Sequence, residues 1–183
     1  MSKKKLAVAE EPKELIRLDF GCGKNPKEGF DGVDQIDFGQ KHIWNLAIVW
    51  PIGDETVSEV HSSHFLEHLT GEQRILFFNE LGRVLVQGGK ATIITPHASH
   101  VCAYGDPTHQ WPPITEWSYQ YTNKAWRDGN APHVAMTCDF DFSYGYGPDQ
   151  RLNGRNPEFV QMAIQTQWNA ARDLHVTMTK RMA

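Results

Sequence analysis

The sequence has few cysteines, and their placement argues against a disulfide-bonded scaffold. Only three occur in 183 residues, namely Cys22, Cys102 and Cys138, and no two of them form a C-x-x-C pair. An odd number of widely separated cysteines is typical of reduced thiols in the cytosol rather than of paired disulfides. We therefore expect a cytoplasmic protein with free thiols.

The chain also lacks an excess of one charge and a long apolar run. Its formal net charge is −4 and its pI is about 6.1, so it has no basic character for binding duplex nucleic acid. The apolar run at residues 6–9 is too short for the core of a signal peptide, and no stretch approaches the length of a membrane span. Neither duplex nucleic acid nor a membrane is expected as a partner.

A third absence concerns a glycine. The stretch LDFGCGKNP at residues 18–26 contains Gly21 and Gly23, but Pro26 stands where a dinucleotide-binding fingerprint has its third glycine. Only the nine residues 24–32 then separate this turn from the next apolar strand, and a full crossover helix usually needs more. The first helix should be vestigial, and most of the usual anion site for a pyrophosphate should be missing with it. A cofactor without phosphates fits better than NAD.

The length is that of one domain. We expect residues 1–14 to form a flexible tail and residues 15–183 to form a single domain, with a substrate-side insert at about 97–132.

Alternating strand and helix patterns predict an α/β fold. Strand patterns occur at 15–20, 31–34, 57–62 and 90–95, with a weaker one near 42–46. The strongest helix pattern runs from Gly71 to Leu85, and Thr70 and Gln73 before and within it have the spacing of a capping box. This order predicts a Rossmann-like, mostly parallel sheet with helices on both faces.

The alternation of strand and helix patterns ends in the last third of the chain. Apolar and polar residues alternate from Val134 to Tyr144, which predicts a long half-buried strand. Asn156 and Pro157 then open a helix in the usual way. Its expected buried side consists of Phe159, Val160, Ala163, Ile164 and Trp168. A final alternating strand at 174–178 completes the sheet, which should therefore end in an antiparallel strand.

Four segments in register resemble a known family. They are LDFGCG (18–23), GVDQID (32–37), VSEVHSSHFLEHL (57–69) and ELGRVLVQGGKATIITP (80–96). In this order and at these intervals they resemble the class I S-adenosylmethionine-dependent methyltransferases, and most closely the small members with a shortened first helix. The resemblance covers residues 15–96 well and the remainder only in general plan. It implies S-adenosylmethionine as the cofactor.

The resemblance also assigns cofactor-binding residues. Asp19 would orient the glycine turn and the amino-acid end of the cofactor, and Asp34 would accept the ribose hydroxyls. Asn45 stands where the family usually has an aspartate against the adenine, so it can accept a hydrogen bond there without a charge. The full expected set is Asp19, Gly21, Cys22, Gly23, Asp34, Gln35, Asn45, Leu46, Ser62, Ser63 and His64.

Two other readings of the region after the fourth strand are weaker. Residues 64–68 spell H-x-x-E-H, an inverted zinc-protease motif in which two histidines on a helix hold the metal. The same letters are common in the methyltransferase family, where Glu67 and His68 serve capping and packing, so we expect no metal. The Pro-Pro-aromatic turn of DNA amino-methyltransferases is replaced by HSSH at residues 61–64.

The insert supplies the candidates for catalysis. A histidine is the natural base for a hydroxyl near neutral pH. The candidate catalytic residues are His97, His100, Asp106 and His109. Several aromatic residues follow, and we expect them to form a lid over the reaction. Alternatively, they form a contact surface in a homo-oligomer.

Together these patterns predict a methyltransferase that transfers a methyl group to a hydroxyl of a small molecule, sugar or nucleotide. The alternative is a protein that binds S-adenosylmethionine but has lost catalysis and acts through partners.

Overall fold

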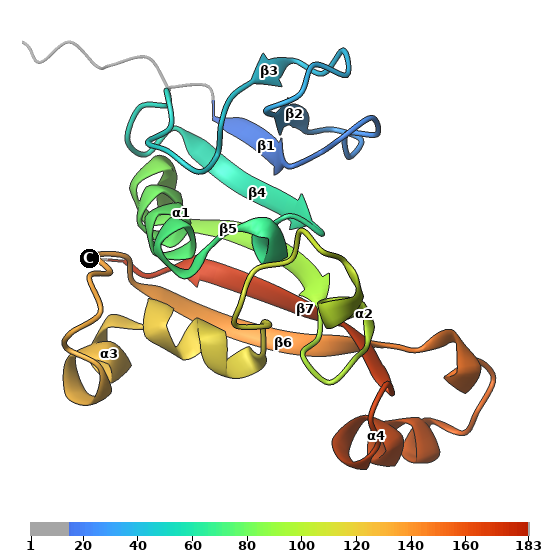
Figure 1. The fold of residues 1–183 in the computed structure, drawn as a ribbon. Helices are drawn as coiled ribbons and strands as arrows, with labels where there is room; N and C mark the ends of the chain where they lie inside the picture. Colours follow the sequence, from blue (N-terminus) through green and yellow to red (C-terminus); the bar gives the residue numbers. More distant parts are fainter. Residues whose placement is uncertain (1–14, 183) are drawn as a thin grey trace, which may run out of the picture.

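The computed structural model describes residues 15–182, in which seven strands form one sheet (Figure 1). The predicted flexible tail, residues 1–14, lies outside the described residues. Along the sheet the strands follow the order β3-β2-β1-β4-β5-β7-β6. Their bounds are β1 (Ile16–Phe20), β2 (Asp31–Asp34), β3 (His42–Ile43), β4 (Val57–Ser63), β5 (Leu85–Pro96), β6 (Phe140–Pro148) and β7 (Ala171–Lys180).

The first five strands pair in parallel, β7 pairs antiparallel with β5, and β6 pairs antiparallel with β7. This arrangement confirms the predicted Rossmann-like, mostly parallel sheet with an antiparallel end. Residues 24–30, between β1 and β2, form turns and contain no helix, in agreement with Pro26 and the short spacing.

The described residues form four α-helices and three short 3-10 helices. They are α1 (Gly71–Val84), α2 (Cys102–Gly105), α3 (Lys124–Asn130) and α4 (Pro157–Thr166), with short 3-10 helices η1 (Leu66–His68), η2 (Glu116–Thr122) and η3 (Gln150–Leu152). The capping box of Thr70 and Gln73 at the start of α1 is confirmed. No helix in the described residues is long and apolar enough to cross a membrane.

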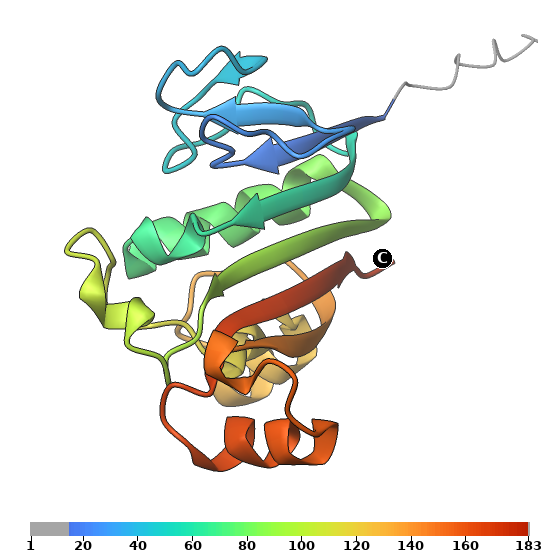
Figure 2. The ribbon, with the colours of Figure 1, turned by 90° about the vertical axis from the view of Figure 1, so that its right-hand side faces the viewer.

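The core lies between the sheet and the helices α1 and η2. Figures 1 and 2 show α1 running along β4 and β5, and its Phe77 and Phe78 are buried there. Phe78 packs edge-on against Tyr119 of η2, and Tyr119 contacts Phe142 of β6. The central strands contribute fully buried Leu18, Val60 and Ile93, among others.

The strand predicted from Val134 onward is wrong in its first half. Strand β6 begins only at Phe140, which pairs with Lys180 at the end of β7, so residues before it have no neighbouring strand. Their backbone is instead bonded by a side chain of α1: Asn79 donates to the carbonyl of Ala135 and accepts from the amide of Thr137. Alternating burial here therefore arises from packing on a helix.

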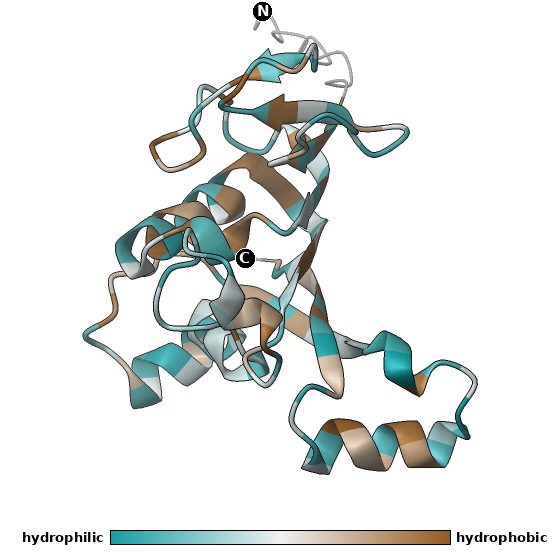
Figure 3. Ribbon diagram, turned by 45° about the vertical axis from the view of Figure 1, so that its right-hand side comes forward, coloured by the Kyte–Doolittle hydropathy of each residue, from teal (hydrophilic) through white to brown (hydrophobic). Residues whose placement is uncertain are grey.

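The predicted buried side of this helix is also wrong for its two largest residues, one of which, Trp168, lies beyond the end of α4. Phe159 is 41% exposed and Trp168 is 61% exposed, whereas Ala163 is buried. Figures 1 and 3 show why: α4 lies beyond the end of β6 and the start of β7, away from the main body, and several of its residues are hydrophobic. An amphipathic pattern predicts an apolar side but not how much of the domain is available to cover it.

Candidate active site

Two cavities lie at the carboxyl ends of the parallel strands, where open α/β sheets hold their ligands. The smaller, of about 170 Å³, lies at the end of β2 and beside the residues after β3. Its lining comprises Asp34, Gln35, Trp44, Asn45, Leu46, Ala47, Phe65, His68, Leu69 and Gln73. Four residues expected to bind the cofactor are thus brought together here, namely Asp34, Gln35, Asn45 and Leu46.

Asp34 links the end of β2 to the glycine turn. Its Oδ2 accepts a hydrogen bond from the Gly23 amide at 3.0 Å, and its Oδ1 accepts one from the Ile36 amide at 3.0 Å. An ionised carboxylate has about four acceptor sites, so each oxygen keeps one for a further donor such as a ribose hydroxyl. This free capacity at the wall of the smaller cavity fits the role that the resemblance assigns to Asp34.

The two glycines of the turn differ in what surrounds them. Both have left-handed backbone conformations, with φ of +67° at Gly21 and +54° at Gly23. A Cβ at Gly21 would lie 2.6 Å from the Phe65 side chain, whereas a Cβ at Gly23 would meet nothing within 4 Å. Gly21 is therefore required by packing, while Gly23 leaves bare backbone facing open space, as close approach of a ligand requires.

This difference predicts unequal effects of two matched substitutions. Both Gly21→Ala and Gly23→Ala carry the left-handed conformational cost, about 1–2 kcal/mol. Only Gly21→Ala adds a steric clash, so its free energy of unfolding should fall by roughly 1–3 kcal/mol more than that of Gly23→Ala. Urea titration of both variants measures this difference, and equal stabilities would show that Phe65 does not pack on the turn.

Asp19 and Ser62 lie beneath the turn rather than in a cavity. The buried Asp19 accepts from the Lys27 amide through Oδ2 at 2.8 Å, and its Oδ1 lies 2.7 Å from Nδ1 of His61. Fully buried Ser62 donates its hydroxyl to the carbonyl of Phe20 at 3.1 Å. Asp19 thus orients the loop after the turn, in keeping with part of its expected role, and Ser62 holds β4 against β1.

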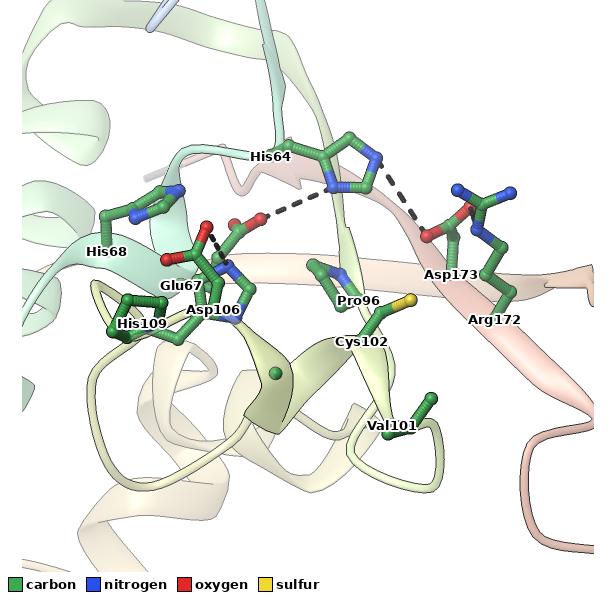
Figure 4. Close-up of a pocket in the computed structure, with 12 residues that line it drawn as sticks. His64, Glu67, His68, Pro96, Val101, Cys102, Asp106, His109, Arg172 and Asp173 are labelled. Atoms are coloured by element: carbon green, nitrogen blue, oxygen red, sulfur yellow. Dashed lines mark ion pairs between the residues drawn. The ribbon is translucent and has the colours of Figure 1, made fainter.

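The larger cavity, of about 650 Å³, is bordered by the end of β4, the start of the insert and the start of β7 (Figure 4). Its lining comprises His64, Glu67, His68, Pro96, Val101, Cys102, Gly105, Asp106, Pro107, His109, Arg172 and Asp173. His68 lines both cavities, so the two are neighbours. The candidates His64, Asp106 and His109 therefore meet in one place.

His64 follows the last residue of β4 with a left-handed φ of +54°, and its amide donates to the carbonyl of Ile94. Its Nδ1 lies 3.4 Å from Oε1 of Glu67, and its Nε2 lies 3.9 Å from Oδ1 of Asp173. The neighbouring Glu67 carboxylate raises the pKa of His64 above its ordinary value, although partial burial opposes the shift. Since residues 64–68 form a turn and a 3-10 helix, the α-helix of the zinc-protease motif is absent here.

Hydrogen bonds determine which nitrogen of His68 carries a proton. The Thr108 hydroxyl donates to Oδ1 of Asp106 at 2.7 Å, so its oxygen must accept from Nδ1 of His68 at 2.9 Å. The two hydrogen bonds from Thr108, one from its hydroxyl and one from its amide, lower the pKa of Asp106. His68 is thereby held with its Nε2 lone pair free.

His109 is held in the same tautomer. Its Nδ1 lies 3.2 Å from the carbonyl of Ala103, which can only accept, so this nitrogen is protonated and Nε2 is free. Nε2 lies 3.9 Å from Oδ2 of Asp106, and the ring packs edge-on against His68 with centroids 4.8 Å apart. Of the insert histidines, His109 is therefore the one that lies beside Asp106.

The other two candidate bases lie elsewhere. His97 contacts Ser99 at Nδ1 (2.8 Å) and Glu116 at Nε2 (3.2 Å). Buried His100 accepts from the Cys102 amide at Nδ1, and its Nε2 lies 3.1 Å from Oδ2 of Asp149. Both rings are occupied on both nitrogens, and neither lines the larger cavity as the described residues form it.

The aromatic residues of the insert do not form the expected lid. Trp111 is 78% exposed and Trp117 is 64% exposed, whereas Tyr119 is fully buried in the core. The amide of Gln110 donates to the carbonyl of Glu67, and the insert residues that line the cavity end just before it, at His109. Within the insert, the residues that border the cavity lie instead at 101–109. That the exposed tryptophans form a contact surface in a homo-oligomer stays a prediction.

Sequence reasoning missed Arg74 of α1, a buried residue that positions this region. Its guanidinium donates to the backbone carbonyls of Leu66 (3.2 Å), Glu67 (3.3 Å), Gln110 (3.0 Å) and Pro112 (2.6 Å). Burial lowers the pKa of Arg74. The side chain joins η1, which carries Glu67 and His68, to the segment that carries His109. A charged residue at an otherwise apolar helix position was the only sign of this role in the sequence.

Comparison with known proteins bears on the fold. No protein-family model and no curated protein sequence matches the chain. Among solved structures, a SAM-dependent methyltransferase from Archaeoglobus fulgidus superposes with a TM-score of 0.65 at 18% identity, covering 92% of this chain and 87% of that chain. A putative methyltransferase from Listeria monocytogenes gives a TM-score of 0.57 at 14% identity, covering 94% of each chain.

A third similar structure is a SAM-dependent methyltransferase from Methanosarcina mazei, with a TM-score of 0.56 at 13% identity, covering 94% of this chain and 95% of that chain. Such low identities establish the fold alone. The chain has the fold of class I S-adenosylmethionine-dependent methyltransferases, as the sequence resemblance predicted.

Proposed function

We propose that this chain is an S-adenosylmethionine-dependent methyltransferase that acts on a hydroxyl of a small molecule, sugar or nucleotide. The observation that carries the proposal is the pair of neighbouring cavities that share His68. One is lined by Asp34 and the residues after β3, and the other is lined by titratable side chains. A transferase needs two such sites, since donor and acceptor must be aligned side by side.

The smaller cavity and the glycine turn fit the cofactor. Asp34 would hold its ribose, Asn45 and Leu46 its adenine, and the backbone near Gly23 its amino-acid end. When bound, S-adenosylmethionine supplies an electrophilic methyl group. The residues that line the smaller cavity would bind and orient this donor. The residues that line the larger cavity would bind the acceptor and take its proton.

In the larger cavity, His109 is the best-placed group to take the acceptor proton. Its free Nε2 faces the cavity and Asp106 lies beside it, which would stabilise the charged ring after proton transfer. The volume of this cavity, about 650 Å³, is in the range of small-molecule sites and favours a small acceptor over a macromolecule.

Substitution of Asp34 tests the cofactor site. Asp34→Ala removes charge-assisted hydrogen bonds worth about 1.5–3 kcal/mol. The Kd for S-adenosylmethionine should therefore rise roughly ten- to a hundredfold. Asp37→Ala is the matched control, because Asp37 is exposed and caps only the Gly39 amide in the same loop. If calorimetry finds the same Kd for the two variants, Asp34 does not contribute to cofactor binding.

A turnover assay separates the enzyme from the alternative, an inactive binding protein that acts through partners. Release of S-adenosylhomocysteine is followed in the presence of panels of sugars, nucleotides and small hydroxylated compounds. An acceptor-dependent release supports the proposal. Tight cofactor binding with no release for any class of acceptor would favour the inactive protein.

A further inference from the structure

The larger cavity contains a buried carboxylate that no hydrogen bond satisfies. Glu67 is only 5% exposed, and neither Oε1 nor Oε2 has a hydrogen-bond partner among the described residues. A buried charge without partners is costly, so such groups are usually paired or coordinate a metal. The half-exposed His64 lies 3.4 Å from Oε1 through its Nδ1, as an ion pair beyond good hydrogen-bond geometry. The guanidinium of Arg74 donates its hydrogen bonds to backbone carbonyls and does not satisfy this carboxylate.

Two histidines lie beside this carboxylate. Ligand atoms of Glu67, His68 and His109 all lie within 4.8 Å of one another. Two donor atoms that share one ion lie about 3.4 Å apart, because each is about 2.1 Å from the ion. Movements of roughly 1 Å, which side-chain torsions readily supply, would bring the three groups onto a common ion.

The hydrogen bonds around both rings are those of metal ligands. Metal-binding histidines almost always donate their other N–H to a carbonyl, carboxylate or similar acceptor, which fixes the tautomer and ring orientation. Here Nδ1 of His109 donates to Ala103, and Nδ1 of His68 donates to Thr108, which in turn donates to Asp106. Both rings are left with a free Nε2 lone pair.

The surrounding charges also favour a cation. Carboxylates of Glu67, Asp106 and Asp173 line the cavity, against the single guanidinium of Arg172. Figure 4 shows His64, Glu67, His68, Asp106 and His109 gathered around the same hollow.

We propose that Glu67, His68 and His109 form a binding site for a divalent transition-metal ion within the acceptor cavity. Two imidazoles and one carboxylate suit ions such as Zn²⁺, Fe²⁺ or Co²⁺ rather than Mg²⁺ or Ca²⁺. The inference departs from the sequence-based expectation of no metal, and it deepens the proposed function, on which its catalytic meaning rests. An ion here would bind an acceptor oxygen beside the methyl donor, and His109 would then act as its ligand.

The test uses tag-free, EDTA-treated full-length protein titrated with Co²⁺ alone, with binding followed by calorimetry and visible absorption. The expected result is one equivalent bound, with absorption bands of nitrogen and oxygen ligation. His68→Ala and His109→Ala should each abolish the bands. Thr108→Val, which keeps all three ligands but frees the His68 ring, should weaken binding roughly 10–100-fold.

Ser99→Ala is the matched control. The Ser99 hydroxyl contacts Nδ1 of His97 just as the Thr108 hydroxyl contacts Nδ1 of His68, but His97 does not line the cavity. It should leave Co²⁺ affinity unchanged, and circular dichroism verifies that each variant is folded. Absence of stoichiometric binding, or equal Co²⁺ affinity in the wild type and in folded Thr108→Val and His109→Ala, would overturn the proposal.

Calorimetry with S-adenosylhomocysteine on the same samples separates the two hypotheses. Cofactor binding without Co²⁺ binding would overturn the metal site alone. Binding of Co²⁺ without cofactor would support the metal site and contradict the methyltransferase.

Discussion

Replacing His109 with alanine is expected to lower turnover by about 10²–10⁴-fold, the usual cost of losing a catalytic base. The reason is that, of the three candidate bases, His109 alone lines the larger cavity, and its Nε2 lies beside Asp106. The Kd for S-adenosylmethionine should change little, because His109 does not line the smaller cavity. Initial rates of S-adenosylhomocysteine release and calorimetric titrations measure the two quantities separately.

His97→Ala is the control for this result. His97 also belongs to the insert and also contacts a carboxylate, but it is bonded to Ser99 and Glu116 and does not line the cavity. Its variant should keep turnover within a few-fold of wild type. A His97→Ala variant that loses activity while His109→Ala keeps it would show that the reaction takes place at another site.

Replacing Arg74 with alanine is expected to destabilise the fold by about 3–5 kcal/mol. The variant would leave backbone carbonyls without a hydrogen-bond donor, and each buried carbonyl left in this way costs about 1–3 kcal/mol. Those carbonyls belong to Leu66, Glu67, Gln110 and Pro112. For a domain of this size, the Tm should fall by roughly 6–20 °C. Differential scanning calorimetry measures the shift.

Arg155→Ala is the matched control, since Arg155 is exposed on the loop before α4. Its Tm should stay close to that of wild type, because surface substitutions usually change stability by under about 0.5 kcal/mol. If Arg74→Ala melted at the same temperature as Arg155→Ala, the guanidinium would not be joining η1 to residues 110–112.

The first half of the fold was predictable because its patterns are local. An apolar strand that ends in a Gly-x-Gly turn, and a capping box before an amphipathic helix, need no distant partner to be recognised. Burial of α4 and the path of residues 134–139 depend on what lies beside them in space. Asn79 of α1 bonds Ala135 and Thr137, and nothing in the local sequence indicates this contact.

The candidate site shows the same division. The family resemblance assigns residues 34, 35, 45 and 46 to the cofactor, and they line one cavity at the carboxyl ends of two neighbouring parallel strands. The four catalytic candidates are titratable residues that follow β5 in the sequence, and of these four only Asp106 and His109 line the larger cavity. Sequence spacing could not show that His97 and His100 are bonded to Glu116 and Asp149, since those partners lie far along the chain.

The central claim, that the glycine turn and the Asp34 cavity hold S-adenosylmethionine, is tested most directly by one calorimetric titration of the wild-type protein. S-adenosylhomocysteine and NAD are titrated in parallel, since the two ligands share an adenosine and differ in the pyrophosphate. The account predicts one equivalent of S-adenosylhomocysteine bound and no heat of binding for NAD. Binding of NAD, or no binding of S-adenosylhomocysteine by folded protein, would contradict it.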